Sequence, residues 1–225
     1  LIMTSPAAST VALLLADARL PSGGHAHSSG LEPALLGGMA PSDVTQFLTL
    51  RAHTTVLVDA GAAVITQAAV ISGGAIDLDA IEQAWAARTP SKAMRDASRD
   101  LGRGLLRLAQ RIWPHAAGMK HLSDAPPRPL VLGVIAAAVG MEPAELVRLA
   151  AYDDLAGAVA ALLKLDPRDP VDGVTLVLDA CASIEPQVPL IAALTSPNQI
   201  PALSAPQAEA WAEQHATTPR RLFRA

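Results

Sequence analysis

Apolar residues recur along this chain at helical spacing, and no credible run of alternating strand residues stands out. Between Pro41 and the paired glycines Gly73 and Gly74, the apolar positions are separated by three, four or seven residues. They are Phe47, Leu50, Leu57, Gly61, Ile65 and Ala68. Steps of this size place side chains on one face of an α-helix. The pattern therefore predicts a long helix with one buried face that ends at the two glycines.

Caps, prolines and glycines predict the other helices. The expected segments are Val11–Ala18 with a Ser9 or Thr10 cap, a short helix from Leu31 to Gly37, a helix capped by Asp77, a helix opened by Thr89 and Pro90 that runs to Trp113, residues 130–140, 143–165 and 171–184, and a last helix from a capping box at Ser204 to about His215. Val171–Leu178 also fits a strand, but Asp169 and Pro170 before it favour a helix start. We predict one all-α domain over residues 1–225, with about eight to ten helices.

Composition narrows the class of protein. Hydrophobic residues make up 51% of the 225 residues and aromatic residues only 3%, which favours closely packed helices over a β-sandwich. The net charge of −4 argues against a general nucleic-acid binder. Cys181 is the single cysteine, so no intrachain disulfide forms and a reducing cytoplasm fits. The longest uncharged stretch, 60–76, is short and partly polar, so we predict no membrane span.

Residues 20–32, LPSGGHAHSSGLE, hold the only close pair of histidines, His25 and His27. In an extended loop, residues two apart point the same way, so two imidazoles could share a metal ion. A tight site needs further ligands, and the local sequence offers none better than Glu32. No zinc-protease, nucleophile-elbow or phosphate-loop motif is present. A capping or contact role for this loop is therefore favoured over a permanent metal site.

The segment 91–113 carries an arginine at every fourth position, from Arg95 to Arg111. This spacing forms a slowly winding cationic stripe on a helix, which either pairs with the chain's own acids or faces a partner. Gly102 and Gly104 lie inside the same segment. Each glycine costs about 1 kcal/mol in a helix interior, so both are expected to permit close approach of another backbone or a partner.

The chain ends in PRRLFRA, residues 219–225, which is basic and contains an aromatic residue. This composition allows two interpretations. Leu222 and Phe223 either pin the chain end to the core or order against a partner.

Three blocks of this sequence resemble the urease accessory protein F (UreF) family. They are LADARLPSGGHAHSSGLE at 15–32, ASRDLGRGLLR at 97–107, and His215 with the RRLFRA end. Their order matches the family, and together they span nearly the whole chain. His25 stands where the family usually has an aromatic residue, and Ala225 replaces a usual serine.

The resemblance implies an all-α, non-catalytic maturation factor in the cytoplasm, with no cofactor of its own. Proteins of this family act as homodimers that bridge UreD (also called UreH) and the GTPase UreG, and so help to insert nickel into apo-urease. Nucleic acid and membrane are not expected partners. The expected partner interface consists of Arg99, Arg103, Arg107, Arg221, Leu222, Phe223 and Arg224. The expected contact loop contains Asp17, Pro21, Gly23, Gly24, His27, Ser28, Gly30 and Glu32. Within this loop, local hydrogen bonds are expected from Asp17, His27, Ser28 and Glu32. A transient nickel contact at His25 and His27 is a further hypothesis.

Two alternatives from other classes remain open. The first is a small metal-binding hydrolase that uses His25, His27 and an acidic partner. The second is a helical regulator that binds nucleic acid through the arginine stripe.

Overall fold

The computed structural model describes residues 6–74, 77–219 and 222–223. The described residues are mostly helical and contain no strand, so the predicted all-α fold is confirmed. The α-helices are α1 (Ala8–Leu15), α2 (Leu31–Leu36), α3 (Val44–Arg51), α4 (Leu57–Ile71), α5 (Leu78–Ala87), α6 (Lys92–Ile112), α7 (Arg128–Val139), α8 (Pro143–Leu165), α9 (Pro170–Ser183), α10 (Val188–Ala192) and α11 (Pro206–Ala216). Val171–Leu178, the one candidate strand, lies within α9.

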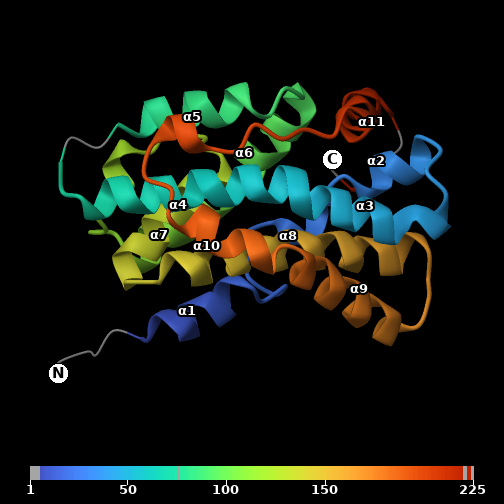
Figure 1. The fold of residues 1–225 in the computed structure, drawn as a ribbon, viewed down its shortest axis with the longest axis horizontal. Helices are drawn as coiled ribbons and strands as arrows, with labels where there is room; N and C mark the ends of the chain where they lie inside the picture. Colours follow the sequence, from blue (N-terminus) through green and yellow to red (C-terminus); the bar gives the residue numbers. More distant parts are fainter. Residues whose placement is uncertain (1–5, 75–76, 220–221, 224–225) are drawn as a thin grey trace.

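Helix α4 forms the centre of the bundle (Figure 1). It packs against α7 and α8, while α6 packs on the far side of α7. Helix α11 returns to contact both α2 and α6, which brings the C-terminal part of the chain beside α2, while the N-terminus lies at the other end of the molecule. The core is built mainly from alanine, leucine, valine and isoleucine, and Trp85 is the most deeply buried aromatic side chain among the described residues.

The predicted long helix from Pro41 to Gly73 is one continuous helical run with an irregular middle. A π-helical turn at Ala52–Val56 joins α3 to α4. Each π turn adds a residue and rotates the following side chains around the axis. For this reason Leu50, before the turn, is exposed, whereas Leu57, Gly61 and Ile65 after it are buried. The prediction that Leu50 shares the buried face is wrong.

Several predicted caps shift by one to three residues. Asp77 caps α5 as expected, because its Oδ1 accepts from the Ala80 N–H at 2.9 Å. Helix α6 is capped by Ser91 instead of Thr89. Helix α1 begins after Ala7, without a cap from Ser9 or Thr10. Helix α11 begins after Ala205, so the predicted Ser204 capping box is absent.

Two helical stretches are long and apolar enough to cross a membrane by length and composition alone. The first, Pro41–Ile71, is mostly buried and serves as the core helix of the bundle. The second, Pro170–Ala192, runs through α9 and α10 and is largely exposed. Such a signal from one or two helices is weak, because core helices of soluble proteins pass the same test.

Candidate partner-docking site

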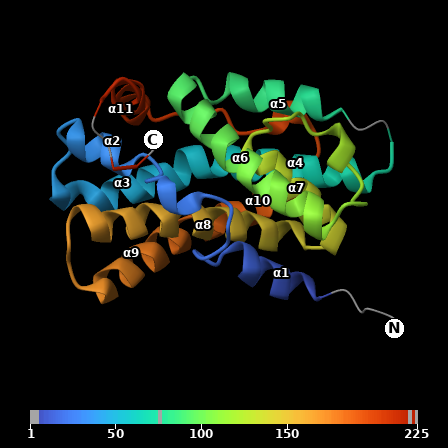
Figure 2. The ribbon, with the colours of Figure 1, turned by 180° about the vertical axis from the view of Figure 1, so that it is seen from behind.

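The glycine-rich loop after α1 crosses the back of the molecule between α6 and α8 (Figure 2). Gly23 and Gly30 adopt positive φ angles of 89° and 80°, which favour glycine. Gly24 has no such angle, and a Cβ there would make only an ordinary contact, 4.0 Å from Ser22 Oγ. The loop is fastened to α8 by Ser29, whose Oγ donates to the Asp154 carbonyl at 3.1 Å.

Helix α6 presses its two glycines against neighbouring backbone. A Cβ on Gly104 would overlap the carbonyl of Ser22 in the loop, and a Cβ on Gly102 would overlap the carbonyl of Pro126. This is the close backbone approach that the sequence predicts for both positions. The first and second sequence blocks are therefore in direct backbone contact.

The third sequence block, His215 and the chain end, contacts the first block through Glu32. This side chain is buried in the first turn of α2. The Leu222 N–H donates to its Oε1 at 2.7 Å, and the Phe223 N–H donates to its Oε2 at 2.8 Å. His215 Nε2 lies 3.0 Å from the same Oε2. The local role predicted for Glu32 is thus incomplete: Ser28 Oγ accepts from its N–H at 3.3 Å, but its carboxylate binds a segment about 190 residues away.

These elements enclose a cavity of about 690 Å³. Its lining comes from the loop, α6, α8 and the chain end, and includes His27, Leu101, Asp154, Lys164 and Phe223. Phe223 is buried, and Lys164 Nζ lies 5.3 Å from the centre of its ring. All three sequence blocks therefore border one cavity.

A half-buried group of five charged side chains forms one wall of this cavity. Arg51 binds Asp154 through two hydrogen bonds of 2.6 and 2.8 Å, and Arg128 pairs with Asp153. The fifth member, Asp59, accepts from Trp85 Nε1 at 2.6 Å. Both arginines stay charged, because the attraction of the aspartates outweighs the burial that lowers the pKa of each guanidinium.

Asp59 is the member of this group whose charged form is disfavoured by its surroundings. Burial raises the pKa of its carboxyl to about 6, and the nearby Asp154 charge adds to the rise. The hydrogen bond from Trp85 and the two arginines oppose this effect without cancelling it.

The structure divides the arginine stripe of α6 into an internal part and an external part. Arg95 donates to the carbonyls of Thr89 and Pro90. Arg99 pairs with Glu82 at 2.9 Å and lies over the Trp85 ring. Both arginines therefore serve the chain's own fold.

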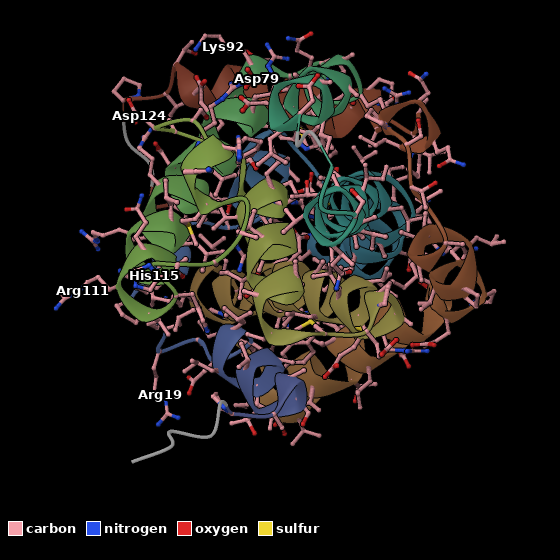
Figure 3. All side chains as sticks on the ribbon, turned by 90° about the vertical axis from the view of Figure 1, so that its left-hand side faces the viewer. Arg19, Asp79, Lys92, Arg111, His115 and Asp124 are labelled. Carbon is pink, nitrogen blue, oxygen red and sulfur yellow. The ribbon has the colours of Figure 1, made fainter. Side chains whose placement is uncertain are left out.

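The remaining arginines of the stripe face outward. Arg103 is exposed and pairs with Asp100. Arg107 and Arg111 are exposed, and no acid pairs with either among the described residues. Arg111 points away from the body of the molecule (Figure 3). The external part of the stripe is the part available to a partner, whereas Arg221 and Arg224 lie outside the described residues.

The two histidines of the loop have different surroundings. His25 is exposed within a short 3₁₀ turn, Gly24–Ala26, whereas His27 is buried. No group of three or more histidine, cysteine, aspartate or glutamate side chains suited to a metal occurs in the described part of the chain. Elsewhere in the loop, Asp17 accepts from the Arg19 side chain, which holds the pKa of Asp17 at about 2.

Comparison with known proteins gives this surface its context. The model of the UreF family matches residues 39–181. Urease accessory protein UreF of Mycobacterium sp. (strain JLS) is 35% identical over 216 residues, which cover 95% of this chain and 97% of that protein. The chain belongs to the UreF family.

Other relatives support the same assignment. UreF of Mycobacterium marinum is 34% identical over 216 residues, covering 94% of this chain and 96% of the relative. UreF of Mycobacterium tuberculosis is 35% identical over 215 residues, covering 95% and 97%. These relatives are accessory proteins rather than catalytic enzymes, so the hydrolase alternative is set aside, and family membership implies association with the machinery of urease maturation.

The half-buried group of charges was not predicted from the sequence. One signal was present: Asp59 is the only charged residue in the apolar run from 52 to 76. A lone acid on the buried face of a helix needs a partner, so it marks a polar cluster in the core. No comparable local signal links Glu32 to the chain end.

Proposed function

We propose that this chain is a non-catalytic scaffold in urease maturation. It bridges UreD/UreH and the GTPase UreG, and it regulates GTP-dependent nickel insertion into apo-urease. Family membership supports the general role. The observation that carries the proposal is the meeting of the three sequence blocks on one face, where Glu32 and the two helical glycines tie them together.

The chain end is the proposed contact with UreD/UreH. Leu222 is 65% exposed, although its backbone is fixed by a hydrogen bond to Glu32. Removing residues 219–225 should abolish capture of UreD/UreH while helicity, measured by circular dichroism, stays intact. Capture of the partner at the wild-type level by the shortened chain would refute this role.

The proposed contact with UreG is the external part of the α6 stripe, Arg103, Arg107 and Arg111. Reversing the charge at Arg107 and Arg111 should weaken UreG binding and flatten its dependence on salt, because exposed ionic contacts are screened. The same reversal at Lys92, an exposed residue at the other end of α6, serves as the control. Arg99 is not part of this proposal, because it is committed to Glu82.

A homodimer is part of the proposal, and α9 offers the face for it. Val171, Val174 and Leu178 are exposed and follow one another at helical spacing. Leu178→Glu should shift the sedimentation of the protein toward the monomer, whereas Leu13→Glu on α1 should not. An unchanged dimer in the Leu178 variant would move the interface elsewhere.

Nickel is cargo of the proposed assembly, which acts in the cytoplasm. The proposal gives this chain no resident cofactor. A transient nickel contact at His25 and His27 is tested by equilibrium titration of the wild type and the doubly His→Ala protein, and identical weak binding would eliminate it.

The whole proposal is tested in a urease-positive cell that lacks its own UreF. This chain is expressed together with its cognate UreD and UreG, and urease abundance is followed by blot. Restored urease activity at unchanged abundance places the chain in assembly of the nickel site. No restoration, with folded protein and partners present, would reject the scaffold role.

A further inference from the structure

The carboxylate of Glu32 is fully occupied by the chain end. Its two oxygens accept from two consecutive backbone N–H groups, those of Leu222 and Phe223, at 2.7 and 2.8 Å. His215 completes the set, with Nε2 3.0 Å from Oε2. Hydrogen bonds to a charged acceptor are the stronger kind, and here they are shielded from water. Glu32 therefore holds the tail through its backbone, in addition to the contacts that the side chains of the tail make.

The two tail residues held by Glu32 differ sharply in exposure. Phe223 is 5% exposed, lines the cavity and lies under Lys164. Leu222 is 65% exposed, beside a residue that is almost fully buried. The buried aromatic side chain anchors the tail, and the leucine is displayed on the surface.

We propose that Glu32 is the positioning residue of the docking tail, and that it presents Leu222 in an ordered conformation to UreD/UreH. The inference rests on the proposed function, in which the tail contacts that partner. The partner surface that fits is an apolar pocket for one leucine side chain, with acidic groups at its rim. The acidic rim follows from the sequence, because arginines occupy positions 220, 221 and 224 around Leu222 and Phe223.

The free energy of binding favours a partner that binds the docked tail over a partner that first pulls the tail away from Glu32. Withdrawing the tail would break two hydrogen bonds to the Glu32 carboxylate and expose the buried Phe223 ring, which costs free energy even though water could then reach the carboxylate. An ordered tail, in contrast, has already lost the conformational freedom that binding would otherwise remove. The free energy of binding is therefore most favourable when the partner binds the tail in the position where Glu32 holds it.

The test compares Glu32→Gln and Leu222→Asp in the full-length chain. Glutamine has the shape of glutamate, but its amide group cannot accept from the second donor. The matched controls are Glu185→Gln, at an exposed glutamate that pairs with Arg148, and Leu190→Asp, at a leucine that is 68% exposed. Two quantities are measured for each variant: hydrogen exchange of the tail amides by mass spectrometry, and the Kd for purified UreD/UreH.

The expected results distinguish the positioning role of Glu32 from the partner contact made by Leu222. Glu32→Gln should accelerate exchange of the tail amides and weaken binding by about tenfold or more, since the free tail must be ordered again on binding. Leu222→Asp should weaken binding at least as much while its tail amides stay protected. The two controls should change neither quantity. If Glu32→Gln does not fold, Phe223→Ala removes the anchor from outside α2 and should likewise accelerate exchange and weaken binding.

Three outcomes would each overturn either the docking role of the tail or its positioning by Glu32. If Leu222→Asp binds UreD/UreH like the wild type, the tail is not at the partner surface, and the docking role in the proposed function fails. If Leu222→Asp loses binding but a variant with a released tail keeps the wild-type Kd, the docking role stands and positioning by Glu32 is rejected. Unchanged tail exchange in both Glu32→Gln and Phe223→Ala would also reject it.

Discussion

Three half-buried aspartates line the cavity, whereas the buried Glu32 binds the chain end that also lines it, and the two sets of acids are satisfied in different ways. Asp59, Asp153 and Asp154 are held on core helices and meet Arg51 and Arg128, which belong to other parts of the core. Glu32 has no arginine or lysine partner in the described chain and is satisfied by His215 and by backbone N–H groups of the tail. The first group joins helices that must stay together, whereas the second depends on a chain end that can leave. Identical side-chain chemistry therefore serves the stability of the fold in one place and presentation of a surface in the other.

The largest effect should come from breaking the pair between Arg51 and Asp154. Their side chains are 12% and 20% exposed, so Arg51→Ala leaves a nearly buried carboxylate without its cation. We expect a loss of about 3–5 kcal/mol in the free energy of unfolding, measured by urea denaturation. Arg148→Ala is the control, because its pair with Glu185 is about half exposed and should be worth about 1 kcal/mol or less. Equal losses in the two variants would show that the buried group is not a stabilising unit.

The next effect is a pH dependence centred on Asp59. Its pKa is about 6 in the folded chain and ordinarily 3.8. Between these values the folded state holds a proton that the unfolded state has released, so stability falls as pH rises from about 4 to 6 and stays lower above that range. The shift corresponds to at most about 3 kcal/mol. Asp59→Asn cannot ionise, and it should be more stable than the wild type at pH 7.5.

The measurement is urea denaturation of both proteins between pH 4 and 7.5. The difference in stability should grow with pH and level off above pH 6. A constant difference across the range would mean that Asp59 does not titrate in it. Asp96→Asn, at an exposed acid on α6, is the control and should show little change.

The contrast between the two acid groups also explains what the sequence could predict. Helices α4, α6, α7, α8 and α9 follow from periodicity, prolines and glycines, which act within a few residues. Periodicity wrongly places Leu50 on the buried face, because no local sequence signal indicates the π turn at Ala52–Val56. This turn changes the phase of the helix. Cap positions shift because several residues that can cap stand close to one another, as Thr89 and Ser91 do.

The candidate site was predictable in part, and for the same reason. The cost of a glycine inside a helix is a local quantity, so Gly102 and Gly104 could be singled out before their contacts were known. The partner of Glu32 could not, since it lies about 190 residues away and is mostly backbone. Every residue other than proline has a backbone N–H, so residue types do not indicate which N–H groups will bind Glu32.

A smaller effect should follow from filling the contact between α6 and the loop. Gly104→Ala would place a Cβ against the backbone of Ser22, which has to move. Overpacking costs about 1–3 kcal/mol, and the better helix propensity of alanine offsets about 1 kcal/mol of this cost, so we expect a net loss of up to about 2 kcal/mol. Gly157→Ala in α8 is the matched control. Its Cβ would lie 3.5 Å from Ser29 Oγ, an ordinary contact, so this variant should be unchanged or slightly more stable. A gain in both variants would show that the loop yields freely.

The smallest effect on global stability should come from Glu32→Gln, although this change is aimed at a fully buried carboxylate. The tail can detach alone, and water can then reach the groups that it leaves, so the penalty is limited to the cost of local release. We expect a loss of about 1 kcal/mol in urea denaturation, well below that of Arg51→Ala, together with fast exchange of the tail amides. A loss as large as that of Arg51→Ala would place the tail within the cooperative core. In that case Glu32 would belong with Asp59, Asp153 and Asp154 as part of the fold, and the distinction between the two groups of acids would disappear.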